Sequence, residues 1–330
     1  MTARVMAEAK TRVLTADAAA IAEAARLLAA GGLVAFPTET VYGLGANAAD
    51  GAAVARLYAA KGRPSFNPLI AHVASAAAAR KLARFDAAAA RLADALWPGP
   101  LTLVLPKTAG CLVADLATAG LDSIAVRVPA HPVAQDILRE FGGPVVAPSA
   151  NPSGHVSPTT AAHVLADLDG RVDLIVDGGT TPVGVESTII ACLDTPALLR
   201  PGGITREAIE RVLGQPLADA SALSTAKNAP RAPGMLESHY APRTPLRLDV
   251  RAVAPGEALL AFGPQLAEGA ARATKVLNLS ARGDPIEAAA SLFLHLRALD
   301  ALGATAIAVM PIPDEGLGEA INDRLRRAAR

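Results

Sequence analysis

The stretch KGRPSFNPLIAH at residues 61–72 gathers side chains that are able to bind phosphate. Lys61 and Arg63 supply cations and Asn67 supplies an amide, while two prolines keep the backbone extended and out of a helix. Arginine offers a forked set of donors and lysine a point charge, a combination that suits a polyphosphate tail. A solvated basic turn at the end of a helix explains the same residues equally well. In either case we expect an exposed loop, in which truncation of Arg63 costs little folding stability.

Polar groups also follow the apolar strand pattern LVAF, in the stretch FPTETVYGLGANA. Thr40 belongs to this group, and Gly43 and Gly45 would let a backbone approach a ligand closely. The glycines are not a dinucleotide fingerprint, because the third glycine and the acidic partner are missing. Taken alone, this stretch favours a glycine-rich turn over a binding site. His72, in LIAHV, is equally compatible with an ordinary, partly buried strand residue.

A third polar cluster lies in VVAPSANPSGHVSPT, which places Ser149 and Asn151 between a strand and a helix. Its hydroxyl and amide groups either form Asx and serine turns or accompany helix N-terminal amides that face an anion. A serine hydrolase is disfavoured because no GxSxG elbow is present. Ser187 in VGVESTII and Arg200 in LLRPGGIT are each compatible with a purely structural role.

The elements that must position these residues form a mixed α/β pattern. Helices are predicted at about 17–30 and 50–60, and from proline-marked starts at Pro132 and at Ser157–Pro158. Strands are predicted in LVAF, LIAHV, LTLVL, SIAVRVP, PVVAP, DLIVD and STIIACL. In an open α/β sheet, strand ends and the adjoining loops converge on one crevice. The polar groups expected there are Lys61, Arg63, Arg127, Arg200, Thr40, Asn67, Ser123, Ser149, Asn151, Thr159 and Ser187.

Composition narrows the class of protein. The 330 residues allow two domains, and 31 basic against 31 acidic residues argue against a nucleic-acid binder. Charges interrupt every alanine-rich stretch, so no window reaches the length of a membrane span, and no N-terminal leader pattern is seen. These features predict a cytoplasmic protein with reduced thiols at Cys111 and Cys192. No cluster of His, Cys or carboxylate residues indicates a protein-held metal, so a divalent ion would be carried on phosphates.

Three regions are predicted along the chain. Residues 1–214 carry the mixed pattern, residues 215–243 lack a sustained period, and residues 244–330 return to a small α/β unit. The middle region is long for a linker without secondary structure, which indicates a functional or disordered segment. It ends in APGMLESHYAPR, whose prolines and His–Tyr pair are more than a spacer needs. We therefore predict that residues 231–243 form a lid, with Tyr240 folding over the site.

Seven motifs, in order, resemble those of the YrdC-type L-threonylcarbamoyladenylate synthases. They are PTETVYGLG, KGRPSFNPLIAH, WPGPLTLVL, AVRVPAHP, APSANPSG, ESTII and LRPGGIT. The run APGMLESHYAPRTPL and the unit after it resemble the long, two-domain form of the family. One departure is Phe66, where a polar residue is commoner. The resemblance implies a YrdC-like twisted open mixed sheet with flanking helices, followed by a linker and a small Rossmann-like α/β domain.

The resemblance also implies an activity. L-threonine and bicarbonate or CO2 would form a carbamate that displaces pyrophosphate from ATP, giving threonylcarbamoyl-AMP. ATP is then a substrate, with Mg2+ carried on its phosphates. A separate tRNA threonylcarbamoyl transferase would use the product to modify a tRNA adenosine, so direct tRNA binding by this chain would be weak.

Family roles fall on matching positions of this sequence. L-threonine would be held by Thr40, His72, Arg127, Ser149 and Ser187, and ATP by Arg63, Asn67, Ser123, Asn151, Thr159, Arg200 and Tyr240. Lys61 and Arg63 would be catalytic and stabilise charge as pyrophosphate leaves. One alternative is a double-stranded RNA-binding module of the same fold without catalysis, which the zero net charge disfavours. Another is the carbamoyl-transfer domain of hydrogenase maturation proteins, whose zinc-finger segments two cysteines cannot supply.

Overall fold

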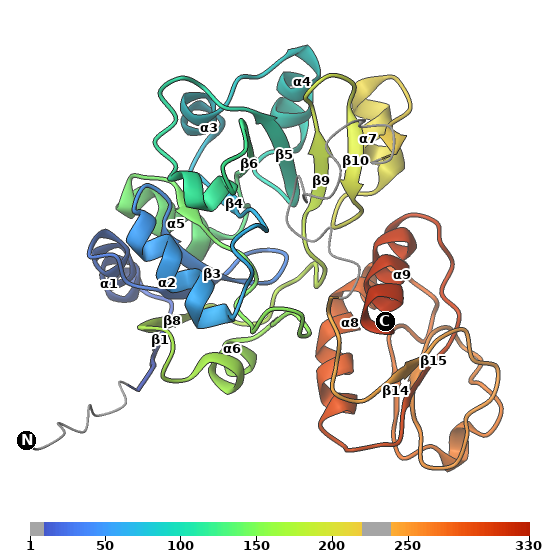
Figure 1. The fold of residues 1–330 in the computed structure, drawn as a ribbon. Coiled ribbons are helices and arrows are strands. Elements are labelled where there is room, and N and C mark those ends of the chain that lie inside the picture. The colour runs from blue at the N-terminus through green and yellow to red at the C-terminus, as the bar shows by residue number, and fades with distance from the viewer. Residues whose placement is uncertain (1–9, 220–238) are drawn as a thin grey trace, which may run out of the picture.

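The computed structural model describes residues 10–219 and 239–330 (Figure 1). These residues form a large mixed sheet with its helices and a smaller parallel sheet, drawn in orange and red, with helices of its own. Within these two ranges, no helix is both long enough and apolar enough to cross a membrane.

The helices begin where the sequence supplies a cap. The Asp17 side chain accepts a hydrogen bond from the N–H of Ala20, and Asp50 accepts from the N–H of Ala52, so α1 and α2 start directly after these residues. Pro132 opens α5, where a missing N–H costs nothing. The α-helices are α1 (Ala18–Ala29), α2 (Gly51–Lys61), α3 (Ala76–Leu82), α4 (Ala87–Leu96), α5 (Pro132–Phe141), α6 (Ala161–Leu168), α7 (Arg206–Leu213), α8 (Pro285–Asp300) and α9 (Leu317–Ala328).

The large sheet has 11 strands in the order β1-β8-β2-β3-β7-β4-β6-β5-β9-β10-β11. Parallel and antiparallel pairs are mixed within it: β4 and β6 run parallel, whereas β5 and β6 run antiparallel. Its strands are β1 (Arg12–Thr15), β2 (Val34–Pro37), β3 (Tyr42–Asn47), β4 (Ile70–His72), β5 (Leu101–Pro106), β6 (Ser123–Arg127), β7 (Val145–Val146), β8 (Leu174–Asp177), β9 (Thr188–Ala191), β10 (Ala197–Arg200) and β11 (Ala218–Asp219).

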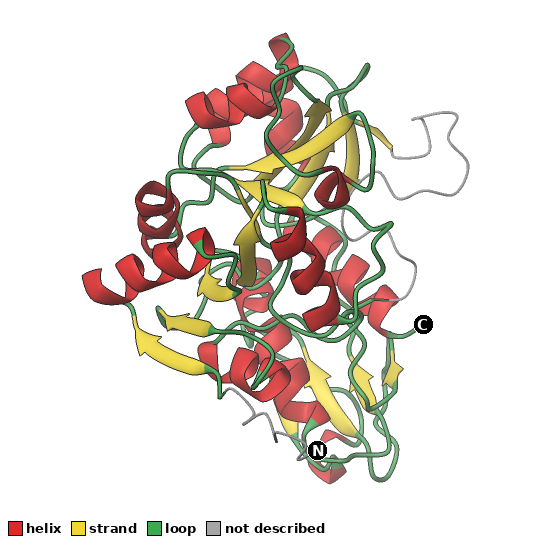
Figure 2. Ribbon diagram, turned by 60° about the vertical axis from the view of Figure 1, so that its left-hand side comes forward, coloured by secondary structure: helices red, strands yellow, loops and turns green. Residues whose placement is uncertain are grey.

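Helices pack against the large sheet from both faces, as the two views of Figures 1 and 2 illustrate. Val34 and Phe36 belong to a core shared with α1 and α5, whereas Ala35 belongs to a core shared with α2 and α4. This alternation is the two-residue period of a strand that is buried on both sides. Because the faces are covered, polar side chains can gather only at the strand ends and in the loops beyond them.

The C-terminal unit is a four-stranded parallel sheet, in the order β12-β15-β13-β14, packed with α8 and α9. Its strands are β12 (Leu246–Arg247), β13 (Ala258–Ala261), β14 (Val276–Asn278) and β15 (Ile307–Val309). Its hydrophobic core extends to Val41, Val156 and Val185 of the first unit. Gly184 has a φ of +76°, and a Cβ there would lie 2.3 Å from the carbonyl oxygen of Ala289 in α8. The loop before β9 therefore docks closely against the C-terminal unit.

The predicted fold class is confirmed, and most predicted elements are present, but two local interpretations are wrong. The helix expected from Ser157–Pro158 begins at Ala161, because the Thr160 side chain caps it. The stretch that favoured a glycine-rich turn contains strand β3. A Cβ at Gly45 would lie 2.7 Å from the ring of Phe36, so the glycine there serves close strand packing.

Part of the predicted lid lies outside the described residues. Residues 231–238 belong to that part, whereas 239–243 are described, so the lid at 231–243 stays a prediction. The boundaries at 214 and 243 also stay predictions, and β11 adds a strand to the large sheet just past the first of them. Cys111 and Cys192 are both free thiols, as expected.

Candidate functional site

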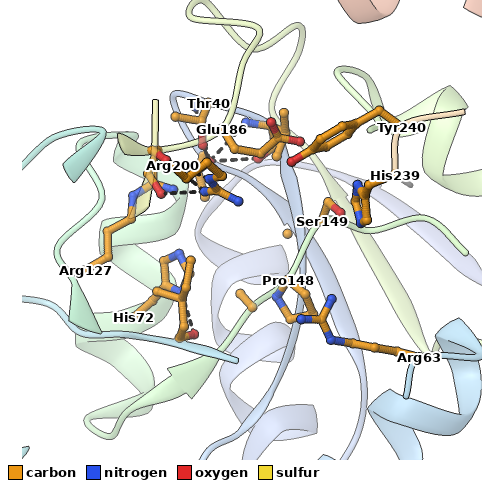
Figure 3. Close-up of a pocket in the computed structure, with 16 residues that line it drawn as sticks. Thr40, Arg63, His72, Arg127, Pro148, Ser149, Glu186, Arg200, His239 and Tyr240 are labelled. Atoms are coloured by element: carbon orange, nitrogen blue, oxygen red, sulfur yellow. Dashed lines mark hydrogen bonds between the residues drawn. The ribbon is translucent and has the colours of Figure 1, made fainter. Parts of the chain in front are cut away.

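A polar pocket lies where the ends of several strands of the large sheet face the segment that leads into the C-terminal unit. It holds about 570 Å³ of empty space, including its open mouth. Figure 3 shows Arg127 and His72 on one side of the pocket and His239 and Tyr240 on the other. The lining residues are Thr38, Thr40, Val41, Gly43, Arg63, Ile70, His72, Arg127, Ala147, Pro148, Ser149, Glu186, Ser187, Arg200, His239 and Tyr240.

The turn between β2 and β3 presents two hydroxyl groups to the pocket. The hydroxyl groups of Thr38 and Thr40 lie 2.8 Å apart, and the Thr38 hydroxyl also donates to the carbonyl of Val41 over 2.7 Å. These contacts fix the turn from within, so the buried hydroxyl of Thr40 is held in place before any ligand binds.

Arg127, at the end of β6, carries a buried cation on the pocket wall. Its Nη2 donates to Oε1 of Glu39 over 2.7 Å, and Oε2 of Glu39 accepts from the N–H of Ala130. Burial opposes ionisation of Glu39, but the charge and hydrogen bond of Arg127 outweigh it, and the pKa of Glu39 lies below its ordinary value. The Nε of Arg127 is buried and has no hydrogen-bond partner among the described residues. This nitrogen is a donor available to an anionic ligand.

His72, at the end of β4, is a neutral ring in the pocket. Burial, together with the nearby charge of Arg127, lowers its pKa to about 3. Its Nδ1 lies 3.2 Å from the carbonyl oxygen of Ile70, which requires the proton to sit on Nδ1. Nε2 is then left with a lone pair that is able to accept a hydrogen bond from a ligand.

Ser187 and Arg200 form a second polar group at the start of β9. The Ser187 hydroxyl lies 2.8 Å from the hydroxyl of Thr102, and Nη2 of Arg200 donates to the Ser187 carbonyl over 2.8 Å. Gly202 makes this close packing possible, because a Cβ there would lie 2.3 Å from the carbonyl oxygen of Glu186. The guanidinium of Arg200 is thereby locked against the residue that carries the serine hydroxyl.

Arg63 follows the end of α2 and is buried rather than exposed, contrary to our expectation. It is 8% exposed, and it donates to the backbone carbonyls of Asn67 and Pro68. The loop 61–72 therefore folds around its own cation instead of leaving it in solvent. Burial lowers the pKa of Arg63 to about 10, at which the guanidinium still carries its charge near neutral pH.

Lys61 supports the pocket from behind. Its Nζ donates to the carbonyl oxygens of Ser149 and Asn151 and so holds the loop that carries Ser149. Burial, reinforced by the charge of Arg63, lowers the pKa of Lys61 well below its ordinary value. A lowered lysine pKa close to Arg63, the candidate phosphate ligand, is typical of functional sites. Lys61 itself does not line the pocket.

The structure brings most of the predicted site residues together. Those that line the pocket are Thr40, Arg63, His72, Arg127, Ser149, Ser187, Arg200 and Tyr240. Those that do not are Lys61, Asn67, Ser123, Asn151 and Thr159. Ser123 begins β6 at the end opposite Arg127, about 13 Å away at roughly 3.3 Å per residue. The side chain of Asn67 is fully buried, and neither its oxygen nor its nitrogen has a partner among residues 10–219 and 239–330.

Asn151 and Thr159 stand behind the pocket in the same loop region. Nδ2 of Asn151 donates to the carbonyl of His155 over 2.8 Å, and its Oδ1 has no partner among the described residues. The hydroxyl of Thr159 lies 3.4 Å from Nδ1 of His163. Phe66, the departure from the family pattern, is 56% exposed and outside the pocket lining, so it leaves the pocket chemistry unchanged.

Among the lining residues that had no predicted role, two are ionisable. Glu186 and His239 both line the pocket and are both buried. Burial opposes ionisation of Glu186, but the charges of Arg324 and Arg200 prevail and lower its pKa to about 2. In the sequence, each was indicated only by its position next to a predicted site residue, Ser187 or Tyr240. A single motif does not reveal that a polar residue is buried.

The pocket carboxylates do not form a metal site. Glu39 is paired with Arg127, and Glu186 with Arg324. Over residues 10–219 and 239–330, no three His, Cys, Asp or Glu side chains come together as metal ligands would.

Comparison with known proteins identifies the family that this fold and pocket define. The Sua5, YciO and YrdC family, described as "Telomere recombination", matches residues 26–202, and the family described as "Threonylcarbamoyl-AMP synthase, C-terminal domain" matches residues 204–330. The chain therefore belongs to the Sua5/YrdC family and has the form that carries the Sua5 C-terminal domain.

Individual relatives cover nearly the whole chain. The threonylcarbamoyl-AMP synthase of Bacillus subtilis is 44% identical over 94% of this chain and 92% of the relative, and that of Pyrococcus abyssi is 43% identical over 93% of each. The crystal structure of Pyrococcus abyssi Sua5 complexed with L-threonine matches with a TM-score of 0.86, at 39% identity, over 97% of both chains.

Proposed function

We propose that this pocket condenses L-threonine, bicarbonate or CO2, and ATP into L-threonylcarbamoyl-AMP and pyrophosphate. This is the reaction of a threonylcarbamoyl-AMP synthase, which is a nucleotidyltransferase. The relatives from Bacillus subtilis and Pyrococcus abyssi carry that name. The observation that carries the proposal is that Arg127, whose buried Nε has no partner among the described residues, lines one pocket with Thr40 and Ser187. A cation beside hydroxyl groups suits an amino acid that bears both a carboxylate and a hydroxyl.

The threonine half of the site would lie between β4, β6 and β9. Arg127 would receive the substrate carboxylate through its free donor, because its other contact, to Glu39, already fixes the plane of the guanidinium. Thr40, Ser149 and Ser187 would provide hydroxyl contacts, and neutral His72 would accept a hydrogen bond from the substrate. A neutral ring is needed here, because a second cation beside Arg127 would repel the ammonium group of threonine.

The nucleotide half would use the remaining cations. Arg63 and Arg200 line the same pocket and are suited to the phosphates, and Tyr240 closes the wall opposite Arg127. Asn67, Ser123, Asn151 and Thr159 would contact ATP beyond the pocket lining described above. The buried amide of Asn67, without a protein partner, supports this assignment because a ligand would satisfy it.

The reaction needs two bond-forming steps. The amine of threonine, once its ammonium group has lost a proton, forms a bond to the carbon of CO2 and releases a second proton to solvent, or forms a bond to the carbon of bicarbonate with loss of water. Either route gives a carbamate. A carbamate oxygen then bonds to the α-phosphorus of ATP while the bond to pyrophosphate breaks. Lys61 and Arg63 would stabilise the negative charge that builds up on the leaving pyrophosphate, with Lys61 also holding the loop that carries Ser149.

A Mg2+ ion would arrive on the phosphates of ATP. Both carboxylates that line or adjoin the pocket already have arginine partners, which agrees with a metal held by ligand and water rather than by the chain. Its chemistry would be to neutralise charge on the triphosphate.

The product would pass to a separate transferase that modifies tRNA, and direct tRNA binding by this chain would be weak at zero net charge. We propose the cytoplasm as its location, where that transferase would find it. The alternative of an RNA-binding module without catalysis is not favoured, because the relatives that span the chain are named as synthases.

The experiment is detection of the product itself. The full chain is incubated with ATP, isotopically labelled bicarbonate and L-threonine, and the mixture is analysed by mass spectrometry. We expect threonylcarbamoyl-AMP that carries the label, and no labelled alanylcarbamoyl-AMP when L-alanine, which lacks the hydroxyl, replaces threonine. Absence of the labelled product from a folded chain would refute the proposal.

A further inference from the structure

The arginine that pairs with Glu186 is a buried charge of the C-terminal unit. Arg324, on α9, is 0% exposed, although an arginine is almost never fully buried without partners. It lies on the apolar stripe of α9 between Ile321 and Leu325, where the helix packs into the shared core. A charge at this place in the fold is costly unless its contacts are specific, so its partners indicate what it does.

Two of the partners of Arg324 line the pocket, and the third is Asp323 on the same helix, whose Oδ2 accepts from Nη1 over 2.6 Å. Nε of Arg324 donates to Oε2 of Glu186 over 2.7 Å, and its guanidinium carbon lies 5.1 Å from the ring centroid of Tyr240. Glu186 and Tyr240 both line the pocket, whereas Arg324 does not. Arg324 therefore contacts both Glu186, the neighbour of Ser187, and the ring of Tyr240. The guanidinium carbon of Arg327 also lies 5.1 Å from this ring, so two arginines of α9 hold it.

Both partners are held in a single arrangement. The second oxygen of Glu186 accepts from the hydroxyl of Ser157 over 2.5 Å, so the carboxylate is fixed from two directions. Tyr240 stacks on Phe293 of α8 with the ring centroids 5.8 Å apart. Its backbone has a φ of 67°, a left-handed conformation that is unfavourable for a tyrosine and persists only where surrounding contacts hold it.

We propose that Arg324 is a positioning residue, which holds Glu186 and Tyr240 in place in the pocket lining and thereby makes substrate binding depend on docking of the C-terminal unit. The expected effect on substrate KM values rests on the proposed function. The expected effect on the order of the pocket walls does not. The proposal assigns the second α/β unit a task within the site, because Arg324 belongs to α9 of that unit.

A simpler explanation is that Arg324 only joins the two units. The ion pair between Arg206 of α7 and Glu319 of α9 provides the comparison, because it also bridges the units, from the same helix, over 2.8 Å. Neither Arg206 nor Glu319 lines the pocket. Glu319→Gln removes this bridge and leaves both pocket walls intact.

The kinetic test compares Arg324→Gln, Arg324→Lys, Glu186→Gln and Glu319→Gln in the full chain, assayed by pyrophosphate release. We expect Arg324→Gln to raise the KM values for ATP and threonine tenfold or more, with a smaller change in kcat. Arg324→Lys should recover part of this loss because it keeps a cation beside the ring and the carboxylate. Glu319→Gln should stay within twofold of the unchanged protein. Unchanged KM values in a folded Arg324→Gln chain, or an equal effect of Glu319→Gln, would overturn the proposal.

A second readout needs no activity. Backbone hydrogen exchange is measured in the free protein and its variants around 186–188 and 239–241. We expect exchange there to accelerate tenfold or more in Arg324→Gln and to stay unchanged in Glu319→Gln. If Arg324→Gln does not fold, Glu186→Gln should show the same acceleration. Unchanged exchange would reject the positioning role even if the protein proved not to be a synthase, whereas a lack of pyrophosphate release by the unchanged protein would reject only the proposed function.

Discussion

Glu39 and Arg127 form a buried ion pair on the pocket wall, with 2.7 Å between Oε1 and Nη2 and side chains that are 9% and 5% exposed. Such a pair contributes little net stability, because desolvation offsets the attraction. Its effect is to fix the guanidinium plane so that the buried Nε, which has no partner, keeps one direction. We therefore expect loss of Glu39 to weaken threonine binding as much as loss of Arg127, which would contact the substrate.

Substitution of either member should therefore weaken threonine binding more than ATP binding. We expect Arg127→Lys to raise the threonine Kd by ten- to a hundredfold, because lysine cannot serve Glu39 and a carboxylate as a fork does. Ser187→Ala should act in the same direction. Calorimetry with each ligand measures the Kd values of the Arg127 and Ser187 variants. A larger loss of affinity for ATP than for threonine would reassign Arg127 and Ser187 to the nucleotide.

Arg63→Ala should impair both ATP use and stability. Loss of the charge at the phosphates should lower kcat/KM by about 100- to 1000-fold, or about 2.7 to 4 kcal/mol of transition-state stabilisation. Loss of its hydrogen bonds to the Asn67 and Pro68 carbonyls should cost about 1 to 3 kcal/mol of folding free energy.

The control for Arg63 is Arg56→Gln, which lies on α2, the helix that Arg63 follows, and outside the pocket. Pyrophosphate release and urea unfolding are measured for both variants. Unimpaired turnover by a folded Arg63→Ala chain would contradict the phosphate assignment.

The buried histidines should make the protein less stable in mild acid. The folded pKa of His72 is about 3, below the unfolded value of 6.5, so the unfolded chain binds the proton first as the pH falls. Stability is then complete above about pH 6.5 and declines toward pH 3, by roughly 2 kcal/mol for one histidine between pH 8 and pH 5. Glu186, whose pKa is about 2, loses its own contribution only below its ordinary value of 4.5.

Urea unfolding of the unchanged protein and of His72→Asn at pH 8 and pH 5 tests this. The variant should lose less stability on acidification, because one of the titrating rings is gone. Equal losses in both proteins would show that His72 is not the neutral, buried ring described here.

The sequence predicted the sheet and its helices well because local signals carried them. Asp17 and Asp50 mark helix starts that the structure confirms. The predictions were wrong where contacts between distant segments determine the local structure. The stretch expected to be a glycine-rich turn forms β3, and Gly45 is a glycine there because Phe36 and Val145 leave no room for a Cβ. Strand-end reasoning placed most site residues in one pocket, but no local pattern revealed that Arg63 is buried by its own loop.

Tyr240→Ala should destabilise the docking of the C-terminal unit as well as the site. Removal of a fully buried aromatic side chain costs about 3 to 5 kcal/mol. If residues 231–243 act as a lid, the same variant should also release threonylcarbamoyl-AMP to hydrolysis faster, because water would reach the mixed anhydride. Tyr240→Phe, which keeps the stack on Phe293, should restore stability.

Limited proteolysis between residues 215 and 243, with and without threonine plus ATP, tests the lid. Protection by the substrates in the unchanged protein, together with a shorter lifetime of the intermediate in Tyr240→Ala, is expected. Identical cleavage in both states and an unchanged lifetime would leave the segment a tether.

The proposed reaction is tested by pyrophosphate release from ATP by the full chain, with threonine and bicarbonate supplied together or omitted in turn. We expect release only when both are present, because the carbamate that displaces pyrophosphate contains atoms of each. Release that is unaffected by omission of threonine, or none with all three substrates in a folded chain, would contradict the proposed reaction.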